Sequence, residues 1–170
     1  GLYKRIVDEM LVELNLLNHQ NEFTQDNLFC VGLTETFKEL MKGYKPEKHL
    51  DLLFESLCSS TNFEANEINE ISKKSQKEFK DKSSNDILKL LTEKSNSKLY
   101  PSRILNLGIY ILISNAQDLK EKDESKTNKL ISDIFEKLNL SANKAEKDIG
   151  IYKSSISKME QAKELIEELR

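Results

Sequence analysis

Apolar residues recur at three- and four-residue steps through most of this chain, which is the spacing of helices that bury one face. Residues 2–17 carry the first such pattern, and residues 28–41 carry the second. Thr24 or Asp26 is placed to cap the second helix, because a side-chain oxygen there accepts a free N–H of the first turn. Residues 46–58 carry a third pattern, which begins at a proline. The short connections predict antiparallel neighbours.

Residues 104–113 are apolar nearly all round and predict a helix that is covered on several sides. Eight of these ten residues are apolar, and the exceptions are Asn106 and Gly108. The run is too short to cross a bilayer, which needs about 20 apolar residues. Pro101 suits the first turn of this helix, and Asn115 suits its end. We expect the other helices to pack around this central segment.

The segments on either side of the central helix have weaker patterns. Residues 62–82 are charged, with sparse apolar anchors, and no helix is assigned to them. The other segments are predicted as a cap at 83–85, a short helix over 87–91, a loop at 95–97, a polar linker over 119–127 and a helix over 130–138 that Asn139 closes.

The last 29 residues form one long helix, which Ser141 is placed to cap. Apolar residues recur along this helix with the heptad spacing of a coiled coil and form an apolar seam on one side. A single helix cannot bury such a seam on its own, so the seam either packs on the rest of the chain or meets a partner. Both interpretations stay open. The seam slips by one residue near its end, and its members are Ala142, Ala145, Ile149, Tyr152, Ile156 and Met159, followed by Ala162, Ile166 and Leu169.

These patterns together predict an all-α fold. We expect a single helical bundle domain of about seven helices, with residues 1–139 as a helical body and residues 140–170 as a long C-terminal coiled-coil-like arm. The chain begins at a glycine and ends inside a helical pattern, so we expect the whole protein to have further residues at its ends.

Composition narrows the class of partner. Charged residues make up 32% of the chain, with only five glycines and two prolines, which is typical of long solvated helices. The net charge of −3 gives no basic field, so nucleic acid is not an expected partner.

Cys30 and Cys58 have no metal-type spacing, and two free thiols in a reducing compartment are expected, with one disulfide as the alternative.

Three carboxylates on the first helix, Asp8, Glu9 and Glu13, raise the question of a metal site. A di-metal carboxylate bundle also needs Glu-x-x-His pairs, and neither His19 nor His49 has a glutamate three residues before it. We therefore predict no metal, no cofactor and no catalytic residue.

Ion pairs are the alternative use of these carboxylates. Lys4 stands four residues before Asp8, and Arg5 stands four residues before Glu9. Side chains at this spacing are neighbours on a helix surface and can form ion pairs. Glu9 and Glu13 lie in so apolar a helix that we expect half-buried pairing with Arg5 or Arg103.

The internal glycines stand alone and form no phosphate-binding loop. Gly32 and Gly108 fall in the middle of predicted helices, where a missing side chain allows a neighbouring helix to approach closely. Gly43 is placed to close the second helix.

Two segments are candidates for partner contact. Residues 44–49 form a polar connection that carries an aromatic side chain, and a structural turn is the competing interpretation. The second candidate is the apolar seam of the last helix. The predicted partner-binding residues are Tyr44, Lys45, Tyr152, Ile156, Met159, Ile166 and Leu169.

Several blocks of the chain, in this order, resemble the thylakoid formation family, also called photosystem II biogenesis proteins. The blocks are LYKRIVDEMLVELNLL at 2–17, FCVGLTETF at 29–37, MKGYKPE at 41–47, LFESLC at 53–58, LGIYIL at 107–112, and the tail segments EKDIGIYK at 146–153 and MEQAKEL at 159–165. Residues 62–100 and 119–130 show the resemblance least.

The resemblance implies an all-helical protein with a C-terminal coiled coil, of cyanobacterial or plastid origin. It implies a non-enzymatic accessory role in thylakoid biogenesis and photosystem II assembly or repair. The implied partners are the thylakoid FtsH protease and photosystem II intermediates, and the implied location is the cyanobacterial cytoplasm, peripheral to the cytoplasmic face of the thylakoid membrane. The alternatives are a metal-carboxylate helical-bundle enzyme and a self-associating structural scaffold.

Overall fold

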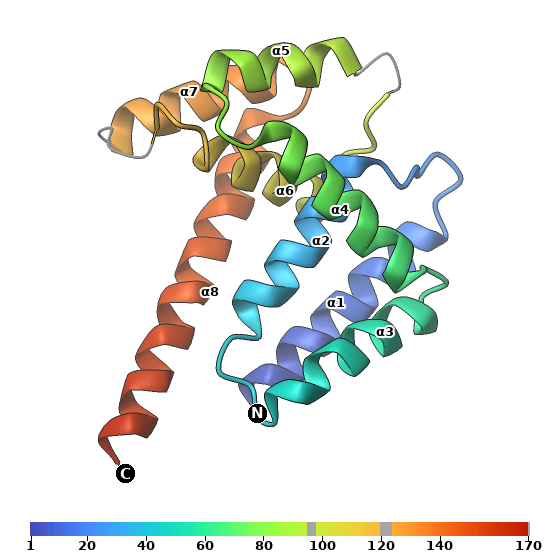
Figure 1. Cartoon of the computed structure of the whole chain (residues 1–170), viewed down its shortest axis with the longest axis vertical. Coiled ribbons are helices and arrows are strands. Elements are labelled where there is room, and N and C mark those ends of the chain that lie inside the picture. The colour runs from blue at the N-terminus through green and yellow to red at the C-terminus, as the bar shows by residue number, and fades with distance from the viewer. Residues whose placement is uncertain (95–97, 120–123, 170) are drawn as a thin grey trace.

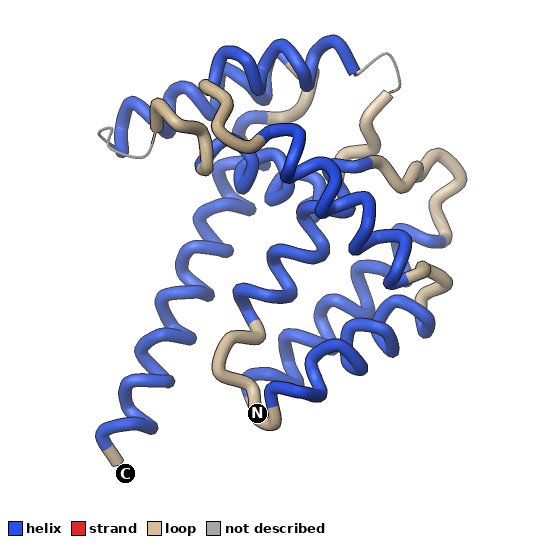
Figure 2. The backbone as a smooth tube through the Cα atoms, viewed as in Figure 1, coloured by secondary structure: helices blue, strands red, loops and turns tan. Residues whose placement is uncertain are grey.

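The computed structural model describes residues 1–94, 98–119 and 124–169, and the regular structure in these ranges is helical (Figure 2). The predicted all-α fold is confirmed, with eight α-helices in the described ranges instead of about seven. They are α1 (Leu2–Asn18), α2 (Asn27–Leu40), α3 (Leu50–Ser60), α4 (Ala65–Phe79), α5 (Ser84–Lys94), α6 (Arg103–Ser114), α7 (Glu124–Lys137) and α8 (Ala142–Glu168), with a short 3-10 helix at Glu47–His49.

The centre of the molecule is the crossing of α2 and α6, which share the most extensive contact between helices in the described residues (Figure 1). α6 is the predicted central helix, and most of its side chains are buried. Gly32 of α2 and Gly108 of α6 face each other at the crossing. A Cβ atom at Gly32 would overlap the carbonyl oxygen of Ile104, and a Cβ atom at Gly108 would overlap that of Leu28. The predicted close approach at both glycines is confirmed.

Two hydrophobic clusters lie on either side of this crossing, and α2 contributes to both. One cluster joins α2 to α1, α3 and the start of α4, with Phe29 and Phe63 among its large side chains. The other joins α2 and α6 to α5, α7 and α8, around Phe135. The body of the protein is therefore held by one shared pair of helices, and displacement of α2 from α6 would open both clusters.

Side-chain caps define where several helices begin. Asp26 accepts a hydrogen bond from the Phe29 N–H at 2.8 Å, and Ser141 accepts one from the Lys144 N–H at 3.2 Å, so both predicted caps are confirmed. The start of α6 was predicted wrongly. Ser102 is its cap, so Pro101 precedes the helix instead of lying in its first turn. A serine oxygen satisfies a free N–H, which proline cannot do.

Three further boundaries differ from the predictions. Residues 62–82, to which no helix was assigned, contain α4. The third helix begins with a 3-10 turn after Pro46 and becomes α-helical only at Leu50. α7 begins at Glu124, so the last residues of the predicted 119–127 linker are helical. The predicted loop at 95–97, and residues 120–123 of that linker, lie outside the described residues.

Both cysteines are free thiols with buried side chains inside the first cluster. Burial raises the pKa of the Cys30 thiol to about 12 and that of the Cys58 thiol to about 11. A thiol with so high a pKa is protonated at neutral pH, and the thiolate is the reactive form.

We therefore expect both thiols of the folded protein to be inert to a disulfide reagent at pH 8. Their reaction should be at least about a hundredfold slower than that of an exposed cysteine, because both the thiolate fraction and access are low. The same reagent should titrate both thiols rapidly in 6–8 M urea (a denaturant range of about this size unfolds most domains). Fast reaction of either thiol in the native protein would contradict the burial of Cys30 and Cys58.

Candidate functional site

The first half of α8 packs on the body, and its last turns do not. Ala145, Ile149 and Tyr152 belong to the second cluster, together with α6 and α7. A buried polar contact adds specificity to this packing, because the Asn106 amide on α6 donates to the Asp148 carboxylate on α8 at 3.0 Å. Beyond Met159, which is buried, α8 extends along the molecule toward the end where the N-terminus lies (Figure 1).

The last turns of α8 form one wall of a groove of about 1610 Å³. In Figure 1, α2 lies between α8 and the neighbouring pair α1 and α3, and residues of all four helices line this groove, together with α4. Its apolar lining comes mainly from Phe37 of α2, Leu50 and Phe54 of α3, and Met159 and Ile166 of α8. Phe37, Phe54 and Met159 are buried and form the floor of the groove, whereas Leu50 is half-buried and Ile166 is exposed on its walls.

Charges of both signs line the groove, and the α3 side is the acidic one. On the α3 side stand Glu47, Asp51 and Glu55, spaced four residues apart, and on the α2 and α8 sides stand Lys38 and Lys163. None of these five side chains forms an ion pair with another residue of the described ranges. Their charges are therefore available to a molecule that enters the groove.

The connection between α2 and α3 closes one end of the groove and is held by aromatic contacts. The Tyr3 and Tyr44 rings meet edge to face with centroids 5.4 Å apart, and the Tyr3 hydroxyl donates to the Lys42 carbonyl at 2.8 Å. Gly43 has φ +86°, a conformation in which a side chain would be strained, and it lies two residues beyond the α2 cap. Burial raises the pKa of the Tyr3 hydroxyl.

Polar side chains of α2 and α4 form the opposite end. The Thr34 and Ser72 hydroxyls are 2.6 Å apart, and the Gln76 amide donates to Ser72 at 3.1 Å and to the Glu35 carboxylate at 3.0 Å. This network fixes α4 against α2. It also gives the groove one polar end, whereas the aromatic connection makes the other end largely apolar.

The structure brings together four of the predicted partner-binding residues. Tyr44, Lys45, Met159 and Ile166 all line the groove, although they come from segments more than a hundred residues apart. Of the other three, two lie elsewhere on α8 and Leu169 is its C-cap. Tyr152 is 5% exposed and Ile156 packs on the second cluster, while Leu169 is 85% exposed at the end of the helix.

The lining residues of α3 and α4 were not among the predicted partner-binding residues. Glu47, Asp51 and Glu55 recur every four residues, which places them along one face of a helix, and that spacing was the available signal. The polar residues of α4 gave no comparable signal, because the segment was not assigned to a helix.

The carboxylates of α1 are used in ion pairs. Lys4 pairs with Asp8 at 2.7 Å and Arg5 with Glu9 at 3.0 Å, so the predicted pairing along the helix is confirmed. The expected partial burial of Glu9 is wrong, because the Arg5 and Glu9 side chains are 76% and 62% exposed. Within residues 1–94, 98–119 and 124–169, no three His, Cys, Asp or Glu side chains gather in a way that would hold a metal ion.

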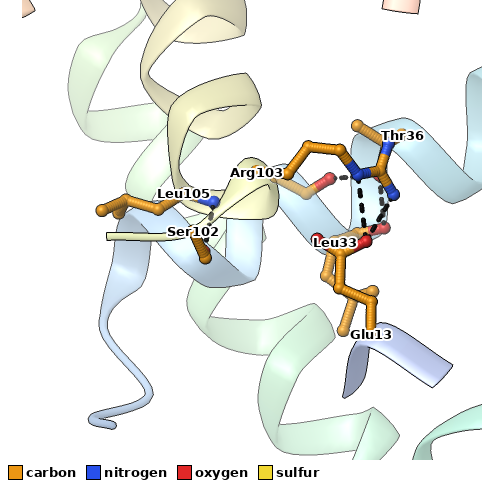
Figure 3. A network of polar contacts seen from close by, with 7 residues as sticks. Glu13, Leu33, Thr36, Ser102, Arg103 and Leu105 are labelled. Carbon is orange, nitrogen blue, oxygen red and sulfur yellow. Dashed lines mark hydrogen bonds and ion pairs between the residues drawn. The ribbon is translucent and has the colours of Figure 1, made fainter. Parts of the chain in front are cut away.

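Glu13 pairs with Arg103 across the helices, as predicted. The guanidinium donates through Nη2 at 2.6 Å and through Nε at 3.0 Å to one carboxylate oxygen, beside the Ser102 cap of α6 (Figure 3). The two side chains are 22% and 29% exposed. This pair links the start of the central helix to α1.

A double-mutant cycle with Glu13→Gln and Arg103→Met should give a coupling energy of roughly 1 kcal/mol, because the pair is partly buried. Urea denaturation of the four proteins measures it. The exposed pair Arg5 and Glu9 provides the matched control, for which we expect at most about 0.5 kcal/mol. Equal coupling in the two cycles would show that Arg103 adds nothing beyond a surface ion pair.

A family model described as thylakoid formation protein matches residues 1–170, the whole chain. The chain belongs to the thylakoid formation protein family. It is 85% identical over its full length to Protein Thf1 of Prochlorococcus marinus strain MIT 9312 and covers 85% of that protein. It is 71% identical to Protein Thf1 of Prochlorococcus marinus subsp. pastoris and covers 84% of it.

The fold agrees with a solved structure. The chain superposes on Psb29 with a TM-score of 0.85 and 25% sequence identity, over 99% of this chain and 85% of that one. The family resemblance read from the sequence blocks is therefore confirmed, and membership ties the chain to thylakoid formation. In the part of the chain that the structure describes, no helix combines the length and apolar character of a membrane span.

Proposed function

We propose that this protein is a non-enzymatic accessory factor in thylakoid biogenesis and photosystem II assembly or repair, and that its groove is a docking site. The partner is the thylakoid FtsH protease or a photosystem II assembly intermediate. Membership of the thylakoid formation family supports the process. The partners come from the resemblance described above, and the cytoplasmic face of the cyanobacterial thylakoid is the proposed peripheral location.

One observation carries the docking role. Two segments chosen from sequence as separate partner-contact candidates, the connection at Tyr44 and the distal half of α8, meet in one groove. That groove combines accessible apolar side chains, Tyr44 and Ile166 among them, with unpaired charges on its walls. Aromatic anchors within a charged rim are the composition of protein interfaces.

Affinity capture from cyanobacterial thylakoid membranes tests this function. The immobilised full chain should enrich FtsH or photosystem II subunits, measured by quantitative mass spectrometry. Ile166→Ser should reduce this enrichment several-fold, because Ile166 lines the groove and is 58% exposed.

Leu16→Ser is the matched control for that capture. Leu16 lies on α1, is 60% exposed and is not part of the groove lining. Its replacement should leave the enrichment unchanged. Absence of both partner classes from the captured proteins would contradict the proposed function, and equal loss with the two variants would contradict the docking site.

Self-association is a second candidate function, favoured by the exposed apolar end of α8. Leu165, Ile166 and Leu169 are all exposed there. Sedimentation velocity distinguishes the two functions. A dimer that Ile166→Ser converts to monomer would favour a self-associating scaffold, whereas a monomer across the micromolar range would favour an accessory factor that binds other proteins.

A further inference from the structure

The charges around the groove specify what kind of segment fits it. We propose that the groove binds an amphipathic helix of about three turns, with basic residues along one flank and acidic residues along the other. This inference rests on the proposed docking function and names the chemistry of the segment that docks.

The shape of the groove suits a helix. Its walls are themselves helices, α3 and the end of α8, with α2 between them (Figure 1). A helix about 10 Å across that rises 1.5 Å per residue fills about 120 Å³ per residue. A groove of 1610 Å³ therefore has room for a helix of up to roughly a dozen residues, or about three turns. Apolar anchors at helical spacing would meet the accessible apolar lining at Tyr44, Leu50 and Ile166, above a floor formed by the buried side chains of Phe37, Phe54 and Met159, as in other helix-in-groove complexes.

The α3 wall supplies a row of negative charge. Asp51 and Glu55 stand one turn apart on α3, roughly 6 Å along its axis, and Glu47 lies in the 3-10 helix that precedes it. Asp51 and Glu55 each follow one residue after the apolar Leu50 and Phe54 of the same helix. Basic side chains on the near flank of a docked helix would lie against this row while its apolar stripe meets the aromatic rings.

The wall of α2 and α8 carries lysines. Lys38 and Lys163 line it without an ion pair in the described residues, and Lys42 is already paired with Glu39 at 2.9 Å. Acidic residues also occur on this side, namely Glu35, which accepts a hydrogen bond from the neutral Gln76 amide, and Glu167, one turn beyond Lys163 at the end of α8. The α3 wall is therefore acidic, whereas the opposite wall carries charges of both signs, with Lys38 and Lys163 as lysines that have no ion pair in the described residues. A ligand with a basic flank toward α3 and an acidic flank toward these two lysines satisfies both walls.

The balance of charge disfavours a membrane surface in this groove. Its lining has five lysines, namely Lys38, Lys42, Lys45, Lys73 and Lys163, and five acidic residues, namely Glu35, Glu47, Asp51, Glu55 and Glu167. A patch with no net charge gains little from anionic headgroups, which attract clusters of four or more basic residues.

Three fluorescein-labelled helical peptides test the proposal by fluorescence anisotropy with the full chain. They share one stripe of leucines over about three turns. One has a lysine flank and a glutamate flank, the second has lysine on both flanks, and the third has glutamate on both. We expect the mixed peptide to bind about tenfold more tightly than either of the others, because only it matches both walls.

Reversing the charge of the α3 wall should change the order of the three peptide affinities. In the variant Asp51→Lys plus Glu55→Lys, the mixed peptide should lose about tenfold in affinity and the peptide with two glutamate flanks should become the tightest. The matched control is Glu160→Lys plus Glu164→Lys, which makes the same charge change at the same spacing on the exposed face of α8. It should keep the original order. Circular dichroism and thermal unfolding verify that both variants are folded.

Several results would overturn the proposal. They are equal affinity for the three peptides, no binding of any of them, an unchanged order in the inverted variant, or displacement of the mixed peptide by anionic phosphatidylglycerol vesicles or by a second copy of the chain. These results are separable from the proposed function. Capture of FtsH or photosystem II subunits without peptide selectivity would leave the function standing and remove the helix from this groove.

Discussion

Replacement of Gly32 or Gly108 by alanine should destabilise the protein by at least about 3 kcal/mol, at the upper end of the range for overpacking. The reason is that each new methyl group would meet backbone rather than a movable side chain. A Cβ at Gly32 would overlap the Ile104 carbonyl oxygen and stand 3.1 Å from the Gly108 nitrogen. A Cβ at Gly108 would overlap the Leu28 carbonyl oxygen. Neither carbonyl can move without distorting its own helix.

The only relief is separation of α2 from α6, and both hydrophobic clusters depend on these helices. The loss of stability should therefore affect the whole molecule. Urea denaturation of either variant should show one cooperative transition, at a much lower urea midpoint than that of the unmodified protein. Gly150 provides the control, because it lies inside α8 and an added Cβ would have no atom within 4 Å apart from its chain neighbours and the backbone of its own helix. Gly150→Ala should stabilise the protein by about 0.5–1 kcal/mol, the ordinary preference of a helix for alanine. Destabilisation by all three substitutions, or by none, would contradict the close crossing.

The sequence was most informative where the signal is local. The central helix was recognised because residues 104–113 are apolar on all sides, and the caps Asp26 and Ser141 were recognised because they precede apolar patterns. The role of Gly32 and Gly108 was also predictable. An isolated glycine inside a helix is unfavourable by itself, so its presence indicates a contact that excludes a side chain.

α4 shows why other elements were missed. Its buried positions include Ser72 and Ser75 as well as Ile68 and Phe79. Serine fits beside α2 because its hydroxyl finds a partner there, as the Ser72 contact with Thr34 shows. A buried serine is indistinguishable from a surface serine in a hydrophobic pattern. The sequence of α4 was therefore interpreted as a charged segment with a few apolar anchors.

The groove was beyond sequence analysis for a different reason. Its lining comes from five helices and a connection, and their meeting depends on where α8 lies after residue 159. The heptad pattern identified an apolar seam on α8 but not the surface that packs against it. The structure divides that seam, because Ala145, Ile149 and Tyr152 contact the body and Ile166 and Leu169 are exposed. Packing on the body and exposure to a partner are therefore properties of successive halves of one helix.

Tyr152→Ala should have the second largest effect, a destabilisation of about 3 kcal/mol, which is typical of removing a buried aromatic ring. Tyr152 is 5% exposed, and its ring meets that of Tyr110 on α6 edge to face with centroids 6.5 Å apart. Loss of the ring leaves a cavity between α8 and the body, next to the buried contact of Asn106 with Asp148. Hydrogen exchange should show that α8 loses protection before α2 does. Tyr152→Phe keeps the ring and should be destabilised by less than about 1.5 kcal/mol.

Ile166→Ser distinguishes the role of the distal half of α8 from that of the proximal half. It removes an apolar side chain from the same seam as Tyr152, but about four turns further along the helix. Ile166 is 58% exposed, so its replacement should change the free energy of unfolding by no more than about 0.5 kcal/mol. Binding of the mixed-flank peptide should nevertheless weaken several-fold, since the groove loses an apolar contact. With Tyr152→Ala, binding should weaken only to the extent that α8 is displaced, and a temperature at which α8 stays folded should restore it. If Ile166→Ser unfolded the protein as readily as Tyr152→Ala, the distal half of α8 would be part of the core, and the groove would not have a free wall to offer a partner.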